Sequence, residues 1–83
     1  TFEVGFNYWN ATLGGAESGT LPASPSAGQV VYIKAPSNCS TTNTITINKA
    51  GSQTIDGETA IILESPNAAV SLMYVAANLW KIF

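Results

Sequence analysis

Short runs of alternating apolar and polar side chains fill residues 44–83, and turn-forming residues separate the runs. In the clearest run, Ile45 and Ile47 alternate with Thr46 and Asn48. A period of two places the apolar side chains on one face of a β-strand. The runs are also shorter than ordinary helices. The pattern therefore predicts strands joined by tight turns, and we expect an antiparallel β-meander.

Three tight turns are expected between these runs. Asp56-Gly57 favours the first, because glycine accepts a positive φ and aspartate can hydrogen-bond the backbone of the turn. Pro66-Asn67 favours the second, and residues 76–78 favour the third.

Ile61-Ile62-Leu63 is apolar on both faces, which predicts a strand covered by the core on one side and by a neighbour on the other.

The N-terminal part has a different pattern. Phe2, Val4, Phe6 and Tyr8 share one parity, which predicts a half-buried strand with an aromatic face. Residues 11–28 are rich in Gly, Pro, Ala and Ser and show no periodicity, so they are expected to form an extended connector. We therefore expect two parts. Residues 1–19 would be an N-terminal strand or arm with the start of the connector, and residues 20–83 would be a compact β-body.

The number and spacing of the runs predict the fold class. With the N-terminal strand included there are about six strands, and no segment has the length and caps of a helix. We expect an all-β fold, a small antiparallel β-sandwich or barrel of jelly-roll-like or tulip-like form with an extended N-terminal arm. An isolated sheet would leave two open edges, which closure or a partner must cover.

Charge is scarce. Charged residues make up 10% of the chain, against about 25% in typical globular domains. The net charge is −2, with three lysines, no arginine and no histidine, so no basic face for nucleic acid or for an anionic membrane can form. Two explanations stay open. The surface is either neutral and rich in Ser and Thr, or it is covered by other protein in a homo-oligomer or a larger assembly.

The residues also argue against catalysis. Without histidine, a serine or cysteine nucleophile lacks its usual base. Asp56 and Glu58 flank a turn, where solvation explains them better than a paired-carboxylate site does. Cys39 is the single cysteine, so it can form neither an internal disulfide nor a metal site, and it is expected to be an unreactive loop thiol. We expect no enzyme activity, no cofactor and no metal.

Aromatic side chains are the remaining candidates for a binding function. Trp80 is expected to be a core residue or a plug at one end of a barrel. The N-terminal aromatic residues have two open explanations, as ordinary core of the same domain or as an arm docked on another subunit. The candidate residues for an interface with another protein subunit are Phe2, Phe6, Tyr8, Trp9, Ile61 and Leu63.

Four short motifs follow one another in a fixed order: Ile45-Thr46-Ile47, Thr54-Ile55-Asp56-Gly57, Val70-Ser71-Leu72 and Trp80-Lys81-Ile82. In this order, residues 21–83 resemble a small β-module of tailed-bacteriophage structural proteins, which occurs in head decoration proteins, head fibres and tail fibres. The resemblance implies a capsid decoration (cement) protein on the virion surface. Such a protein binds the major capsid protein on the outside of a phage head and stabilises the head, often as a homotrimer. The alternative is a receptor- or carbohydrate-binding module of a head or tail fibre.

Overall fold

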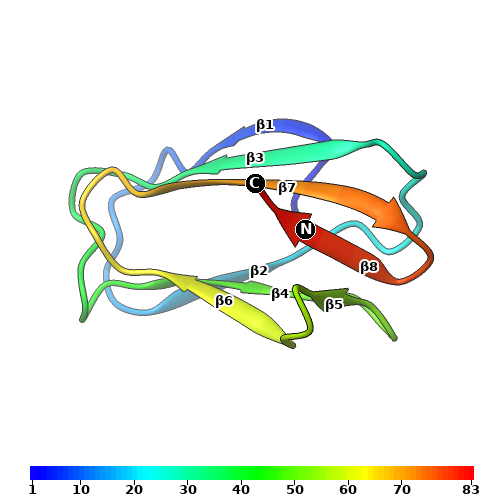
Figure 1. Ribbon diagram of the computed structural model, residues 1–83. Helices are drawn as coiled ribbons and strands as arrows, with labels where there is room; N and C mark the ends of the chain where they lie inside the picture. Colours follow the sequence, from blue (N-terminus) through cyan, green and yellow to red (C-terminus); the bar gives the residue numbers. More distant parts are fainter.

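The computed structural model describes residues 1–83, which form eight strands and no helix (Figure 1). The strands are β1 (Gly5–Tyr8), β2 (Glu17–Thr20), β3 (Val30–Lys34), β4 (Ile45–Asn48), β5 (Thr54–Ile55), β6 (Ala60–Leu63), β7 (Ala69–Ala76) and β8 (Leu79–Ile82). Five of them form one sheet in the order β1-β3-β7-β8-β5, and β2-β4-β6 form the other. The protein is therefore an all-β, sandwich-like domain. None of its segments is a helix long and apolar enough to cross a membrane.

The sheets are mixed, so the expectation of a purely antiparallel fold is wrong. β1 pairs with β3, β2 with β4 and β5 with β8 in parallel. The other three pairs, β3–β7, β4–β6 and β7–β8, are antiparallel. The physical reason is that the chain changes layer after every strand from β1 to β6, so β7 and β8 are the one pair of sheet neighbours joined directly by a tight turn. A tight turn forces an antiparallel pair, whereas strands connected through the other layer can return in either direction, and β3 and β4 return parallel to β1 and β2. Both sheets stay open, so the domain is not a closed barrel.

The three expected turns are confirmed. Around Asp56-Gly57, the N–H groups of Ile55 and Glu58 each donate to the other residue's carbonyl over 2.8 Å, and the two central residues have φ of 49° and 85°. Two positive φ angles define the type I′ hairpin turn that Asp-Gly favours. Pro66-Asn67 forms the second turn, with Asn67 at φ 58°. In the third turn Asn78 has φ 59°.

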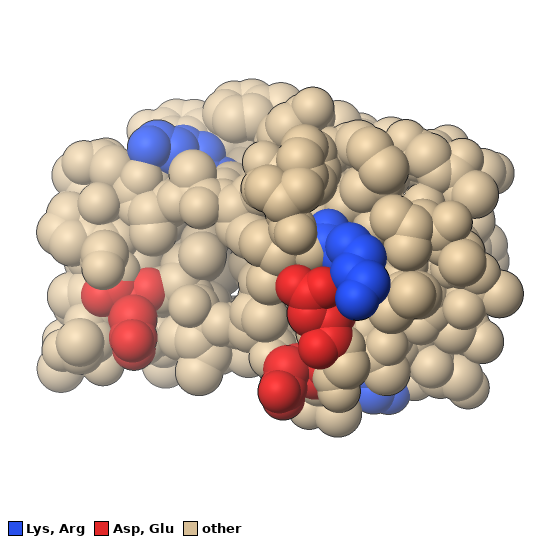
Figure 2. All heavy atoms as spheres, in the orientation of Figure 1, with Lys and Arg blue, Asp and Glu red and all other residues tan.

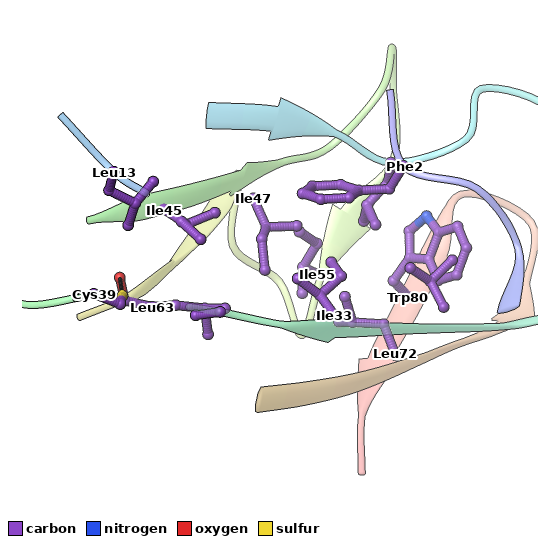
Figure 3. Packing of buried hydrophobic residues seen from close by; sticks show 13 residues of the cluster. Phe2, Leu13, Ile33, Cys39, Ile45, Ile47, Ile55, Leu63, Leu72 and Trp80 are labelled. Carbon is purple, nitrogen blue, oxygen red and sulfur yellow. Dashed lines mark hydrogen bonds between the residues drawn. The ribbon is translucent and has the colours of Figure 1, made fainter. Parts of the chain in front are cut away.

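One hydrophobic core lies between the two sheets, and both sheets contribute to it (Figure 3). The alternation predicted from the sequence explains most of it, since Ile45 and Ile47 of β4 are fully buried beneath the larger sheet. Trp80 is also a core residue, as expected. The buried apolar residues are Phe2, Leu13, Leu21, Val31, Ile33, Ala35, Cys39, Ile45, Ile47, Ile55, Leu63, Leu72 and Trp80.

The N-terminal segment and the connector are packed against this core. Leu13 and Leu21 are buried, and strand β2 lies between them, where the sequence showed no strand pattern. The side chain of Asn38 fastens Leu13 by donating Nδ2–H to its carbonyl over 2.8 Å and accepting its N–H over 3.1 Å. The structure thus places residues 1–19 in the same packed body as residues 20–83.

Cys39 is a core residue rather than part of a polar surface loop. Its side chain is fully buried, and its Sγ donates to the Leu63 carbonyl over 3.3 Å. It is the single apolar group in the loop of residues 37–43, and it anchors that loop to the core. A free thiol behaves in this way as a small hydrophobic residue.

Gln53 is the one polar side chain that is buried. Its Nε2 donates to the carbonyls of Pro22 and Ala23 over 3.0 and 3.4 Å. Its Oε1 accepts the indole N–H of Trp80 over 2.9 Å and the N–H of Ala50 over 3.3 Å. One side chain therefore joins the connector, the loop before β5 and the core tryptophan.

Replacing Gln53 with leucine is expected to lower the free energy of unfolding by about 1–3 kcal/mol, because buried donors and acceptors lose their partners. Urea unfolding followed by circular dichroism measures the change. Gln29→Leu is the matched control, since the Gln29 side chain accepts one hydrogen bond from Ser26 at an exposed turn. Equal losses in the two variants would contradict a special role for Gln53.

Candidate functional site

A row of side chains crosses the outer face of the five-stranded sheet from β1 to β8. The register places Phe6 beside Tyr32 and Tyr32 beside Ser71. Phe83 continues the row, because its N–H donates to the Ser71 carbonyl over 3.1 Å. Both neighbours of Tyr32 in β3 are buried, so Tyr32 itself faces solvent, as do the residues paired with it.

Four exposed aromatic residues, Phe6, Tyr8, Tyr32 and Phe83, define what we call the outer aromatic face. Their side chains are 71%, 58%, 43% and 65% exposed, respectively. Tyr8 extends the face along β1, two residues beyond Phe6 and therefore on the same side of the strand. Soluble monomers rarely expose neighbouring large apolar groups without an interaction to use them. This surface is therefore the strongest candidate for a binding site on the molecule.

The opposite outer face, on the three-stranded sheet, has a different chemistry. There the register aligns Ser18, Thr46 and Ile62 across the strands. Ile62 is exposed and is the large apolar residue of this row. The molecule thus has one aromatic face and one face dominated by hydroxyl groups.

Figure 2 shows one side of the molecule, on which charged atoms occupy a few small areas.

The structure divides the six predicted interface residues into two groups. Phe6 and Tyr8 belong to the outer aromatic face. The other four pack on the core: Phe2 and Leu63 are buried, and Trp9 and Ile61 are half-buried against it. Ile61 and Leu63 therefore fill the inner side of β6, and Ile62 is left on its outer side. The neighbour predicted to cover that outer side stays a prediction.

A backbone bend explains why Phe2 and Phe6 face opposite ways although they share one parity. Gly5 lies between them with φ of 98°, a conformation that favours glycine, and regular alternation starts after it. The Asn7 side chain holds the bend: Nδ2 donates to the carbonyls of Glu3 and Gly5, and Oδ1 accepts the Glu3 N–H. Of the two explanations of the N-terminal aromatics, Phe2 follows the core explanation, whereas Phe6 and Tyr8 are free to meet a partner.

Tyr32 and Phe83 are members of the surface that the sequence reasoning missed as site residues. A signal for both was present. Tyr32 has the opposite parity to Val31 and Ile33, and Phe83 has the opposite parity to Trp80. Parity alone places them on an outer face, but it does not show that they lie in one row with Phe6.

Electrostatics contributes little to this site. Lys81 and Asp56 form the one ion pair, with Nζ and Oδ1 3.5 Å apart and both side chains substantially exposed. Exposed pairs of this kind stabilise proteins by about 0–1 kcal/mol. No group of three or more His, Cys, Asp or Glu side chains is placed to hold a metal ion. The groups that the site offers to a partner are therefore aromatic rings, two phenol hydroxyls and the Lys34 ammonium beside Tyr8, which donates to the Asn67 carbonyl.

Comparison with known proteins identifies no relative of this chain. No family model, no curated protein and no solved structure matches the chain. The similarity to phage structural modules therefore rests on four short sequence motifs and stays a prediction.

Proposed function

We propose that the protein is a structural virion protein of the capsid decoration (cement) type, which binds the outside of a phage head and stabilises it. The observation that supports a binding role is the row of Phe6, Tyr32 and Phe83 on an exposed sheet face. The phage head as location and the major capsid protein as partner come from the sequence motifs. In this proposal the outer aromatic face lies against the capsid.

Burial of the rings supplies the affinity in this proposal. Removing one large apolar side chain from water is worth roughly 1.5–3 kcal/mol. Association and the ordering of side chains at the interface cost several kcal/mol, so one ring alone would bind weakly. Several rings in each copy, and three copies in a homotrimer of the kind the resemblance implies, would multiply modest affinities through avidity.

The other surfaces of the molecule are compatible with this orientation. With the aromatic face on the capsid, the row of Ser18, Thr46 and Ile62 would face away from it. The four aromatic residues of the binding face carry no formal charge. Of the two lysines on the same side of the sheet, Lys81 is already paired with Asp56, which leaves Lys34 beside Tyr8 as the one uncompensated charge. Binding should therefore depend only weakly on salt concentration.

Replacing Phe6 and Tyr32 together with serine is expected to lower occupancy on phage heads at least tenfold, because two exposed rings no longer become buried on binding. The measurement adds purified protein back to particles that lack it and counts bound copies per head. Ile62→Ser is the control, since it removes an exposed apolar side chain from the opposite face, and light scattering should show that its oligomeric state is that of the parent protein. Circular dichroism should show that all variants stay folded. Full occupancy by the double variant would refute the proposed binding face.

A second candidate function is a receptor- or carbohydrate-binding module of a head or tail fibre. The same rings favour it, because such a module presents a solvent-facing aromatic platform to its ligand. The two candidates differ in where the protein sits. Cryo-electron microscopy of purified particles would find a decoration protein on the capsid lattice and a receptor-binding module at the tip of a fibre.

A further inference from the structure

A cleft of about 620 Å³ opens between β1 and β2, the edge strands of the two sheets. β1 contributes residues from Phe6 to Tyr8, and β2 contributes Glu17 to Gly19. The cleft volume lies within the range of about 300–1,000 Å³ that is usual for small-molecule sites. We call this the edge cleft. It shares Phe6 and Tyr8 with the outer aromatic face, whereas Phe2, Trp9 and Glu17 belong to the cleft alone.

Two aromatic rings in the edge cleft are held firmly in place. Phe2 and Trp9 both line it, and their ring centroids lie 6.1 Å apart with an angle of 57° between the ring planes. Phe2 is buried and Trp9 is half-buried against the core, so both rings already have fixed positions before a ligand binds. Figure 3 shows the Phe2 ring directed into the core cluster.

Polar groups on the rim of the cleft are free to meet a ligand. The side chains of Asn10, Glu17 and Ser18 are exposed and line the cleft. Glu17 has no cationic partner, since the protein's ion pair joins Lys81 and Asp56. The cleft thus combines aromatic rings with a carboxylate, a carboxamide and a hydroxyl.

This combination selects the chemical class of the ligand. No lysine side chain lines the cleft and the chain has no arginine, so a phosphate, a nucleotide or an acidic sugar would meet the Glu17 carboxylate without a cationic side chain beside it. A sugar ring has apolar C–H faces that pack on aromatic rings, whose faces carry partial negative charge. Its hydroxyl groups can donate to a carboxylate and can exchange hydrogen bonds with an amide.

We propose that the edge cleft binds one or two units of a neutral sugar chain, with Trp9 as the stacking platform and Glu17 as the acceptor for sugar hydroxyls. The inference rests on the second candidate function and gives that function a position and a ligand class. Docking on a capsid through the outer aromatic face does not depend on it. If the edge cleft binds no sugar, the proposal of capsid docking is unaffected, and the reverse also holds.

The test titrates the ¹⁵N-labelled protein with maltotriose, cellotriose and the trimer of N-acetylglucosamine, and follows amide and indole N–H signals. At least one sugar is expected to shift the Trp9 indole and the Gly19 amide with millimolar affinity. Trp9→Ala should weaken that binding at least tenfold. Glu17→Gln, which leaves the core untouched, should weaken it several-fold. Glu64→Gln is its matched control, because Glu64 is exposed and lies outside the cleft.

Three outcomes would overturn the proposal. The first is the absence of shifts with all three sugars, and the second is binding that Glu17→Gln leaves unchanged. The third is preferential binding of tetramethylammonium, because rings beside a carboxylate would then serve a cation rather than a sugar. Occupancy on phage heads, measured separately, reports on the outer aromatic face and distinguishes failure of the cleft from failure of capsid docking.

Discussion

Replacing Trp80 with alanine is expected to lower the free energy of unfolding by about 3–5 kcal/mol, because the largest side chain of the core is lost. The indole is fully buried, and its ring meets the Tyr74 ring edge-on with 5.1 Å between centroids. Trp80 pairs with Tyr74 of β7 and with Ile55 of β5, so the cavity would open where three strands meet. A chain of this length has a total stability of about 4–12 kcal/mol, so the loss is a large share of it.

Trp80→Phe is the matched control for this result. It keeps a ring against Tyr74 but removes the N–H that donates to Gln53, so the loss should be clearly smaller. Urea unfolding followed by far-UV circular dichroism measures both variants. An unchanged urea midpoint for Trp80→Ala would contradict the placement of the indole in the core.

A second large loss, again about 3–5 kcal/mol, is expected for Phe2→Ala. In the structure the Phe2 ring lies across Gly19 of β2, and the Phe2 N–H donates to the Thr20 carbonyl over 2.8 Å. A methyl group at position 19 would approach two ring carbons to 2.6 and 2.7 Å, which is too close for van der Waals contact. Gly19→Ala alone should therefore cost about 1–3 kcal/mol through overpacking.

The double variant Phe2→Ala, Gly19→Ala provides the sharper measurement. Once the ring is gone, the new methyl group has room, so Gly19→Ala should cost almost nothing in that background. The two losses would then be strongly non-additive, as expected for residues in direct contact. If residues 1–19 were a free arm, Phe2→Ala would leave the stability of the body unchanged. That result would refute the packing of this segment.

The sequence predicted those parts of the fold that depend on neighbouring residues. The alternation of Ile45 and Ile47 with polar residues located β4 and its buried face. The Asp56-Gly57 and Pro66-Asn67 turns followed from which residues accept positive φ or fix a turn. Each of these signals lies within a few residues, so no knowledge of the partner strand was needed.

The parallel pairings could not be predicted in this way. β2 has the sequence Glu-Ser-Gly-Thr, which has low strand propensity and no apolar alternation. It is a strand because β4 lies beside it and pairs with it in parallel. Leu13 and Leu21, on either side of β2, are isolated apolar residues that become core only when the connector folds back on the sandwich. Strand order and direction are properties of the whole chain, and no short window contains them.

The candidate site was predictable to a similar extent. Phe6 and Tyr8 were candidate interface residues because they share one parity, but the sequence left open whether that face was core or interface. It also assigned Phe2 to the same face, because the bend at Gly5 has no unique signature. The row from Phe6 to Phe83 requires the register of three strand pairs. The edge cleft requires the two sheets to end side by side, which depends on the same long-range order.

The position of β8 has a consequence for how the protein is made. β8 is the last strand along the chain, yet it lies between β7 and β5 in the larger sheet. β5 is therefore synthesised before its partner strand, and it can pair only after Leu79 and Trp80 have been added to the chain. At about 5–20 residues per second this delay lasts a few seconds, during which Ile55 and Leu72 have no finished core to enter. The larger sheet and the core beneath it can therefore be completed only after β8 has been synthesised.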